Sequence, residues 1–386
     1  MKTLRLVRSD GSLYEFNPSH EPTAAPSRGP FKSRAAFAAA HVVADPLRTS
    51  EPLTAAVIDW EATLAYREYL WSLGLGVAEA MDTAQRGGGL DWLNAVELIR
   101  RSTAAASGQG RLLACGAGTD HLCPGQAKTI QDVIDAYRMQ CEAIEAAGGR
   151  IILMASRALA AVARHADDYA AVYTAILSEL RHPAILHWLG SMFDPALAGY
   201  WGTPEISTAQ QNCLAIIRAH QEKVDGIKVS LLDAELEIEM RRKLPPGVRM
   251  YTGDDFNYDR LILDDGRGHS DALLGIFDAI APVASQALAA LDAEDLESYQ
   301  NLLAPTVPLA RHLFAAPTQY YKTGVVFLAF LNGFQSHFRM VGGFENARSV
   351  SHLCRLFVLA DEARILGDPE LAAARMRSFL SLAGVA

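Results

Sequence analysis

The sequence predicts an α/β protein: a (β/α)8 TIM barrel with an N-terminal β-hairpin and an all-helical C-terminal extension. Three observations lead to this prediction. From about residue 37, short apolar runs alternate with longer segments of helical period. Eight such pairs occupy roughly 250 residues, which is the length that a barrel of this kind needs. The short runs are apolar throughout, as is typical of parallel strands covered on both faces.

The first 34 residues are expected to form a hairpin followed by a linker. Residues 3–7 and 13–17 are strand-like, and they flank Asp10-Gly11, a favoured hairpin turn because glycine accepts positive φ. Residues 18–34 carry four prolines together with serine and glycine, a composition typical of a connector.

Residues 35–290 are assigned to the barrel. The expected strands are 38–44, 76–81, 111–115, 150–155, 183–188, 224–229, 247–252 and 266–270. The expected helices between and after them are 59–73, 90–106, 128–147, 167–181, 207–222, 233–243, 256–264 and 271–290. Asp59 is placed to cap the first helix, and Gly148-Gly149 to end the third. The eighth strand is assigned because a barrel must close, although its sequence is poor in strand-forming residues.

Residues 291–386 are assigned to the helical extension, with helices expected at 293–303, 307–315, 319–335, 349–366 and 368–383. Such an extension can pack on the barrel or build an interface between subunits. Tyr320-Tyr321-Lys322 is interpreted as a packing or subunit contact within it.

Composition limits the possible partners and the compartment. Half of the residues are hydrophobic, 20% are charged and the formal net charge is -9, so a large core is possible and nucleic acid is not expected as a partner. The five cysteines form no CxxC pair, as expected for reduced thiols in a cytoplasmic protein. The N-terminus lacks the apolar region of a signal peptide, and the run 324–331 is too short to span a bilayer.

Lys228 is the residue that points most directly to chemistry. Active sites of these barrels lie at the carboxyl ends of the strands, and Lys228 lies within the apolar run 224–229. Burial disfavours the ammonium form, which frees the amine to attack a ketone or aldehyde and form an imine. A purely structural lysine, paired with a carboxylate in the barrel, is an equal alternative on spacing alone.

At this lysine the chain resembles the dihydrodipicolinate synthase and N-acetylneuraminate lyase superfamily, in a divergent synthase-like branch. The family carries its Schiff-base lysine in a Gly-(Ile/Val)-Lys run on strand six, which here reads Gly226-Ile227-Lys228. A Gly-x-Asp step follows at strand seven, here Gly253-Asp254-Asp255, and Asp265 to Ser270 is similar to the family's next glycine-rich step. The likeness spans roughly residues 38–290 and implies a lyase of the aldolase type that acts on a 2-oxo acid or keto-sugar derivative.

Two positions depart from the family pattern. The family's Gly-Thr-Thr-Gly-Glu after strand two binds a substrate carboxylate, whereas this chain has Asp82-Thr83, and Asp82 would repel such a group. The family's strand-five tyrosine falls at His187, and histidine can relay protons near neutral pH.

The resemblance therefore implies catalytic Lys228 and His187, with substrate contacts from Asp82, Thr83, Asp254, Asp255 and Ser270. No cofactor and no metal are expected, and the expected partner is a small carbonyl substrate. The chain is expected to form a homo-oligomer, either a dimer or a tetramer, and not to bind a membrane. Two other functions remain open. One is a metal-dependent sugar isomerase or aldolase on the same barrel, and the other is a ligand-binding descendant without catalysis.

Overall fold

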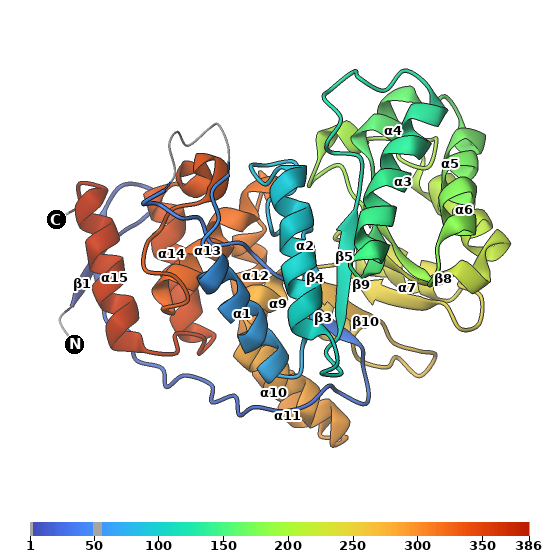
Figure 1. Ribbon diagram of the computed structural model, residues 1–386. Coiled ribbons are helices and arrows are strands. Elements are labelled where there is room, and N and C mark those ends of the chain that lie inside the picture. The colour runs from blue at the N-terminus through green and yellow to red at the C-terminus, as the bar shows by residue number, and fades with distance from the viewer. Residues whose placement is uncertain (1–2, 49–55, 386) are drawn as a thin grey trace.

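A computed structural model describes residues 3–48 and 56–385 of the chain. The first two residues of the predicted hairpin segment and the last residue of the predicted extension lie outside the described residues. Eight parallel strands close into a barrel in the order β10-β3-β4-β5-β6-β7-β8-β9, which confirms the predicted TIM barrel. Figure 1 shows this barrel with its helices outside it. The strands are β3 (Ala36–Ala39), β4 (Gly76–Glu79), β5 (Leu113–Ala117), β6 (Arg150–Leu153), β7 (Ala184–Leu189), β8 (Val224–Ser230), β9 (Arg249–Thr252) and β10 (Asp271–Leu274).

The eighth strand differs from its prediction. Residues 266–270 form an irregular segment in which Gly266 and Gly268 have positive φ, exposed at its start and buried at Ser270. β10 begins only at Asp271, where the helix was expected to start. The strand is Asp-Ala-Leu-Leu, all buried, and it pairs with β3 and β9. The first strand is likewise earlier than predicted, since β3 spans Ala36–Ala39 and a backbone hydrogen bond from Ala40 to Ala78 continues beyond it toward β4.

Helices follow the strands around the outside of the barrel. They are α1 (Trp60–Ser72), α2 (Trp92–Ala106), α3 (Ile130–Ala146), α4 (Arg157–Val162), α5 (Ala166–Glu179), α6 (Ile206–Ala219), α7 (Ala234–Arg241), α8 (Tyr258–Leu261), α9 (Ile276–Ala279) and α10 (Ala281–Asp292). Asp59 caps α1 by accepting a hydrogen bond from the amide of Ala62, as predicted. The seventh predicted helix, 256–264, is reduced to the single turn α8, and α4 was not predicted.

The barrel interior is filled by alternate strand residues. Phe37, Ile152, Ile185, Tyr251 and Leu273 are among the side chains that pack together there. Because neighbouring residues of a strand point to opposite faces, each strand has one set of inward positions. On β8 this set contains Gly226, where an added Cβ would lie 2.6 Å from the ring of Tyr251. Lys228 and Ser230 come next in the same set, toward the carboxyl end of the strand.

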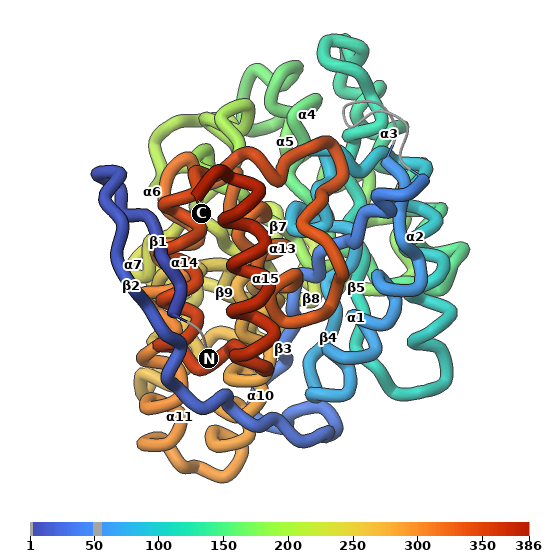
Figure 2. Tube along the Cα trace, turned by 90° about the vertical axis from the view of Figure 1, so that its left-hand side faces the viewer, coloured from blue at the N-terminus to red at the C-terminus, as the bar shows by residue number. Residues whose placement is uncertain are grey.

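The C-terminal helices form a layer beside the barrel, α11 (Leu296–Leu303), α12 (Thr306–Leu313), α13 (Tyr321–Leu331), α14 (Val350–Glu362) and α15 (Pro369–Leu382). They match the five predicted helices in number and order. The N-terminal hairpin of β1 (Leu4–Val7) and β2 (Leu13–Phe16) is antiparallel, and β1 packs on α14 and α15. Figure 2 shows this contact between the two ends of the chain. The hairpin therefore packs with the extension.

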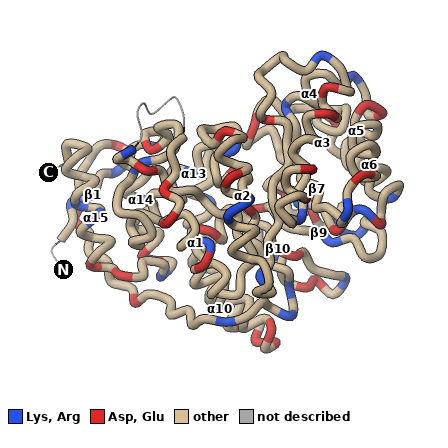
Figure 3. The backbone as a smooth tube through the Cα atoms, viewed as in Figure 1, with Lys and Arg blue, Asp and Glu red and all other residues tan. Residues whose placement is uncertain are grey.

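Positions of basic and acidic residues are interspersed along the backbone (Figure 3). Within the described residues, no helix is both long enough and apolar enough to cross a membrane.

Candidate active site

Lys228 and His187 lie side by side inside the carboxyl end of the barrel. The two residues are direct partners in the parallel ladder between β7 and β8. Their side chains are almost fully buried, with 7% of Lys228 and 1% of His187 exposed. The imidazole Nε2 of His187 lies 3.3 Å from the hydroxyl of Ser230, the next inward residue of β8. Strand pairing therefore fixes the histidine beside the lysine.

Lys228 has no hydrogen bond or ion pair within the described part of the chain. Burial lowers the pKa of its ammonium, and the carboxylates of Asp82 and Asp255 oppose that shift from a distance. A buried amine whose charge is disfavoured and whose nitrogen is not engaged can be deprotonated at low cost. These are the conditions that a nucleophilic lysine requires.

His187 is held in its neutral form. Burial lowers the pKa of the imidazole well below its ordinary value, and the nearby Lys228 lowers it further. Its Nδ1 lies 4.0 Å from the carboxylate of Asp82, beyond hydrogen-bond distance. The imidazole can therefore donate or accept a hydrogen bond, but protonating it is costly.

Asp255 has the titration behaviour of an acid–base group. Burial raises the pKa of its carboxyl to about 7. The backbone amide of Ile276 and the charge of Lys228 favour the ionised form and partly oppose this shift. The amide of Ile276 donates to Oδ1 at 2.8 Å and fixes the carboxyl in place. A carboxyl that titrates near neutral pH can both give and take a proton.

Gly253 leaves the space that the lysine occupies. A Cβ at this position would lie 2.7 Å from Cε of Lys228 and 2.2 Å from Oγ of Ser230. Only glycine therefore lets β9 end this close to the lysine side chain.

The C-terminal extension completes this end of the barrel. The hydroxyl of Tyr321, at the start of α13, lies 2.8 Å from Oγ1 of Thr83, which follows β4. The side-chain amide of Gln85 donates to the carbonyl of Val341 at 2.8 Å. Tyr321 is buried, and burial raises the pKa of its phenol well above the ordinary value, with Asp82 and Asp255 adding to the shift. Tyr321 therefore borders the candidate site, whereas the sequence interpretation treated it as a packing or subunit contact.

Asp254 and Ser270, expected to contact substrate, lie elsewhere. The hydroxyl of Ser270 donates to Glu237 of α7 at 2.7 Å, and Thr252 donates to the same carboxyl at 2.9 Å. Thr252 alternates with the inward-facing Tyr251, so this group is on the helix side of the barrel wall. Asp254 accepts hydrogen bonds from the backbone and side chain of Asn257, in the turn before α8.

Two adjoining cavities open above the site. One, of about 580 Å³, is lined by His187, Asp82, Met154 and the loop 118–125. The other, of about 220 Å³, is lined by Asp82, Gln85, Tyr321 and Lys322. Asp82, Arg86, Gly87, Arg157, Leu189 and Asp194 border both. A small substrate could therefore extend from one cavity into the other past Asp82.

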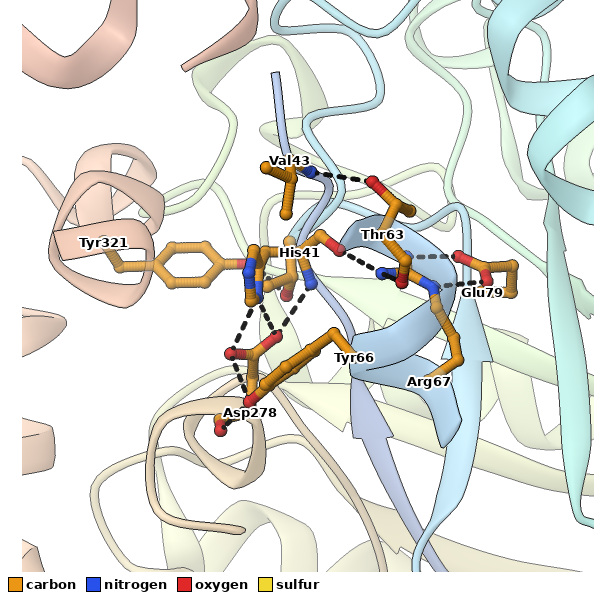
Figure 4. Close-up of polar contacts among 9 residues, drawn as sticks. His41, Val43, Thr63, Tyr66, Arg67, Glu79, Asp278 and Tyr321 are labelled. Carbon is orange, nitrogen blue, oxygen red and sulfur yellow. Dashed lines mark hydrogen bonds and ion pairs between the residues drawn. The ribbon is translucent and has the colours of Figure 1, made fainter. Parts of the chain in front are cut away.

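A second buried polar cluster lies on the opposite wall, around β3 and β4 (Figure 4). Arg67 of α1 donates to both carboxylate oxygens of Glu79, at 2.8 and 2.9 Å. Nδ1 of His41 lies 2.8 Å from Asp278, and Tyr66 donates to the carbonyl of Asp278 at 2.6 Å. Each charge in this cluster has an opposite charge or a hydrogen-bonding partner.

Across residues 3–48 and 56–385, no group of three or more histidine, cysteine, aspartate or glutamate side chains is arranged to hold a metal ion.

A family model described as "Protein of unknown function (DUF993)" matches residues 4–385. The chain belongs to the DUF993 family. No curated protein matches it. The DUF993 chain is similar in structure to dihydrodipicolinate synthases, the enzymes that the strand-six and strand-seven motifs resemble, and shares their fold.

Three of these synthases illustrate the likeness. The enzyme from Thermotoga maritima has a TM-score of 0.60 and 14% identity, over 92% of this chain and 99% of its own. The Aquifex aeolicus enzyme has a TM-score of 0.60 and 11% identity, over 91% and 98%. The Acinetobacter baumannii enzyme, solved as a complex with pyruvate, has a TM-score of 0.59 and 17% identity, over 86% and 100%. At these identities the likeness shows a shared fold.

Proposed function

We propose that this protein is a lyase of the aldolase type in which Lys228 forms a Schiff base with a small carbonyl substrate. The observation that carries the proposal is a buried lysine inside the carboxyl end of the barrel that has no partner within the described residues. The carboxyl of Asp255, whose pKa is about 7, acts on it from a distance. The resemblance to Schiff-base synthases on the same fold supports it.

The proposed reaction begins with attack of the neutral Lys228 amine on the carbonyl carbon. The carbonyl oxygen takes a proton to give a carbinolamine, takes a second proton and leaves as water, and a protonated imine remains. When a C–C bond breaks, its electron pair moves into the imine to give an enamine, and the departing fragment becomes a carbonyl as its hydroxyl gives up a proton. Protonation of the enamine and addition of water then release the second product and regenerate the amine. When a C–O bond breaks, loss of an adjacent C–H proton first gives the enamine, whose electron pair then expels the oxygen, which takes a proton. Addition of water to the resulting imine releases the product and regenerates the amine.

We assign the proton transfers to Asp255, because its pKa of about 7 lets it alternate between acid and base. His187 was expected to relay protons, but a pKa far below 6.5 makes its cationic form costly. We therefore assign it a hydrogen bond to the carbinolamine oxygen. Thr83, linked to Tyr321, and Asp82 contact the polar part of the substrate.

Borohydride trapping tests the proposal. The protein is incubated with sodium borohydride and 2-oxo acids or keto-sugars, and adducts are mapped by mass spectrometry. A reduced adduct on Lys228 is expected, and it should be lost in Lys228→Met but kept in Lys223→Met, whose amine in the wild type donates to the carbonyl of Leu180. Failure of every carbonyl compound to label Lys228 in a protein with a native circular dichroism spectrum would overturn the proposal.

A further inference from the structure

Lys322 is a second lysine without an ionic partner in this region. It follows Tyr321 in α13 and lines the smaller cavity. Its nitrogen lies 5.6 Å from the centre of the Tyr321 ring and makes no hydrogen bond or ion pair within the described residues. Its side chain is partly buried, and burial lowers the pKa of its ammonium, while Asp82 opposes that shift.

The two arginines that line this cavity differ in how many of their side-chain nitrogens form hydrogen bonds. Arg86 is fully used, because it donates to the carboxylate of Asp120, to Gln140 and to two backbone carbonyls. Arg157 donates from Nε to Asp194 at 2.5 Å, and its two terminal nitrogens have no partner in the described residues. These terminal nitrogens lie above Gly87, where an added Cβ would be 3.4 Å from Nη1.

Lys322 is the cation at this cavity that forms no ion pair within the described residues. Arg86 pairs with Asp120, and Arg157 pairs with Asp194. Asp82 favours the charge of Lys322 only from a distance. An incoming anion would give Lys322 a direct partner.

We propose that Lys322, with the free end of Arg157, binds an acidic group that the substrate carries away from its reacting carbonyl. This inference rests on the proposed function and specifies its substrate class: a ketone or aldehyde with a distal carboxylate or phosphoryl group. The carbonyl reaches Lys228 beside His187, and the acidic group lies in the smaller cavity on the other side of Asp82. Lysine and arginine are the usual donors to both kinds of anion.

Matched probes test the inference by borohydride trapping on Lys228. 2-Oxoglutarate is compared with 2-oxobutyrate for a distal carboxylate, and dihydroxyacetone phosphate with dihydroxyacetone for a phosphoryl group. The wild type should label faster with the acidic member of at least one pair, by roughly 10- to 100-fold. The pair that shows the preference identifies the group. Lys322→Met should abolish the preference, Lys322→Arg should retain it, and Lys32→Met, at an exposed position far from the site, should leave it unchanged.

Binding without chemistry separates this inference from the proposed function. In Lys228→Met, calorimetry should show that the preferred acidic probe binds, and that adding Lys322→Met weakens binding by roughly 10-fold or more. If Lys322→Met still labelled faster with the acidic probe, the inference would be overturned, and Lys228 would remain the nucleophile. Absence of any adduct would overturn the proposed function. In that case the inference is judged by calorimetry alone. It would be overturned as well if the acidic probes bound Lys228→Met and Lys228→Met/Lys322→Met with the same affinity.

Discussion

Arg67 and Lys228 are both buried cations, one between α1 and the barrel wall and the other inside the barrel, and their surroundings differ completely. Arg67 forms a two-point ion pair with Glu79 and also donates to the carbonyls of His41 and Thr63. Lys228 has only distant carboxylates. A fold that needs a buried charge satisfies it, because an unpaired one costs several kcal/mol. The contrast suggests that the cluster around Arg67 serves the structure and that Lys228 is kept for chemistry.

The two clusters also differ in which parts of the chain supply them. Arg67, Glu79 and His41 come from the first two strand–helix units and are joined to Asp278 after the last strand, so this cluster closes the barrel seam. The cluster around Lys228 draws on the middle strands and is covered by Tyr321 and Lys322 of the extension. The paired charges thus lie where the barrel closes, and the lysine proposed as the nucleophile lies at the end that the extension covers.

The largest stability effect is expected at the paired cluster. Glu79→Gln leaves the charge of Arg67 buried without an opposite charge, and should lower the free energy of unfolding by about 3–5 kcal/mol. Urea denaturation followed by circular dichroism measures this change. Glu68→Gln, which breaks an ion pair with Arg111 at the surface, should cost about 1 kcal/mol or less. Equal costs for the two substitutions would contradict the structural role of the buried pair.

The next effect depends on pH and concerns Asp255. Because its folded pKa of about 7 lies above the ordinary value, the folded state holds a proton that the unfolded chain releases from about pH 4 upward. Its contribution to stability is therefore lost as pH rises from about 4 to 7, by up to about 4 kcal/mol. The difference in unfolding free energy between wild type and Asp255→Asn should shift across this range in favour of the variant.

Denaturation curves at several pH values measure that difference. Asp167→Asn, at an exposed position in the first turn of α5, is the control and should differ from wild type by the same amount at each pH. A pH-independent difference for Asp255→Asn would mean that this carboxyl is ionised in the folded protein at pH 5, and would remove it as the acid–base group.

The sequence was sufficient for the barrel because a strand covered on both faces is apolar at every position. It misplaced the last strand for a related reason. The run from Asp271 onward is continuous with the apolar helices α9 and α10, so nothing in the periodicity separates the strand from these helices. The preceding glycine-rich turn occupied the expected spacing, and only ladder pairing with β3 distinguishes the two segments.

The site was predictable where it depends on strand alternation alone. Lys228 and His187 lie at inward positions of neighbouring strands, and their pairing follows from parallel register. Asp254 and Ser270 were assigned from a family pattern that does not determine which face of the wall a side chain occupies. Tyr321 and Lys322 could not be placed, because their contact with Thr83 and the loop after β4 joins residues more than two hundred positions apart.

A smaller effect is expected from the residue that makes room for the lysine. Gly253→Ala would place a methyl group 2.7 Å from Cε of Lys228 and 2.2 Å from Oγ of Ser230, so both side chains must move. We expect a loss of about 1–3 kcal/mol in stability and slower labelling of Lys228 by borohydride trapping. Gly29→Ala, where nothing lies within 4 Å of the added carbon, is the matched control. Labelling at the wild-type rate would show that the lysine does not need its present position.

The smallest stability effect tests the comparison most directly, because the same substitution is made at both cations. Lys228→Met removes a buried charge that has no partner and keeps the length of the side chain, so the unfolding free energy should change by no more than about 1 kcal/mol or should rise. Arg67→Met leaves Glu79 unpaired in a fully buried place and should cost about 3–5 kcal/mol. Urea denaturation of the two variants at one pH measures both values. If Lys228→Met destabilised the protein as strongly as Arg67→Met, the lysine would be a structural cation, and its burial would no longer argue for chemistry.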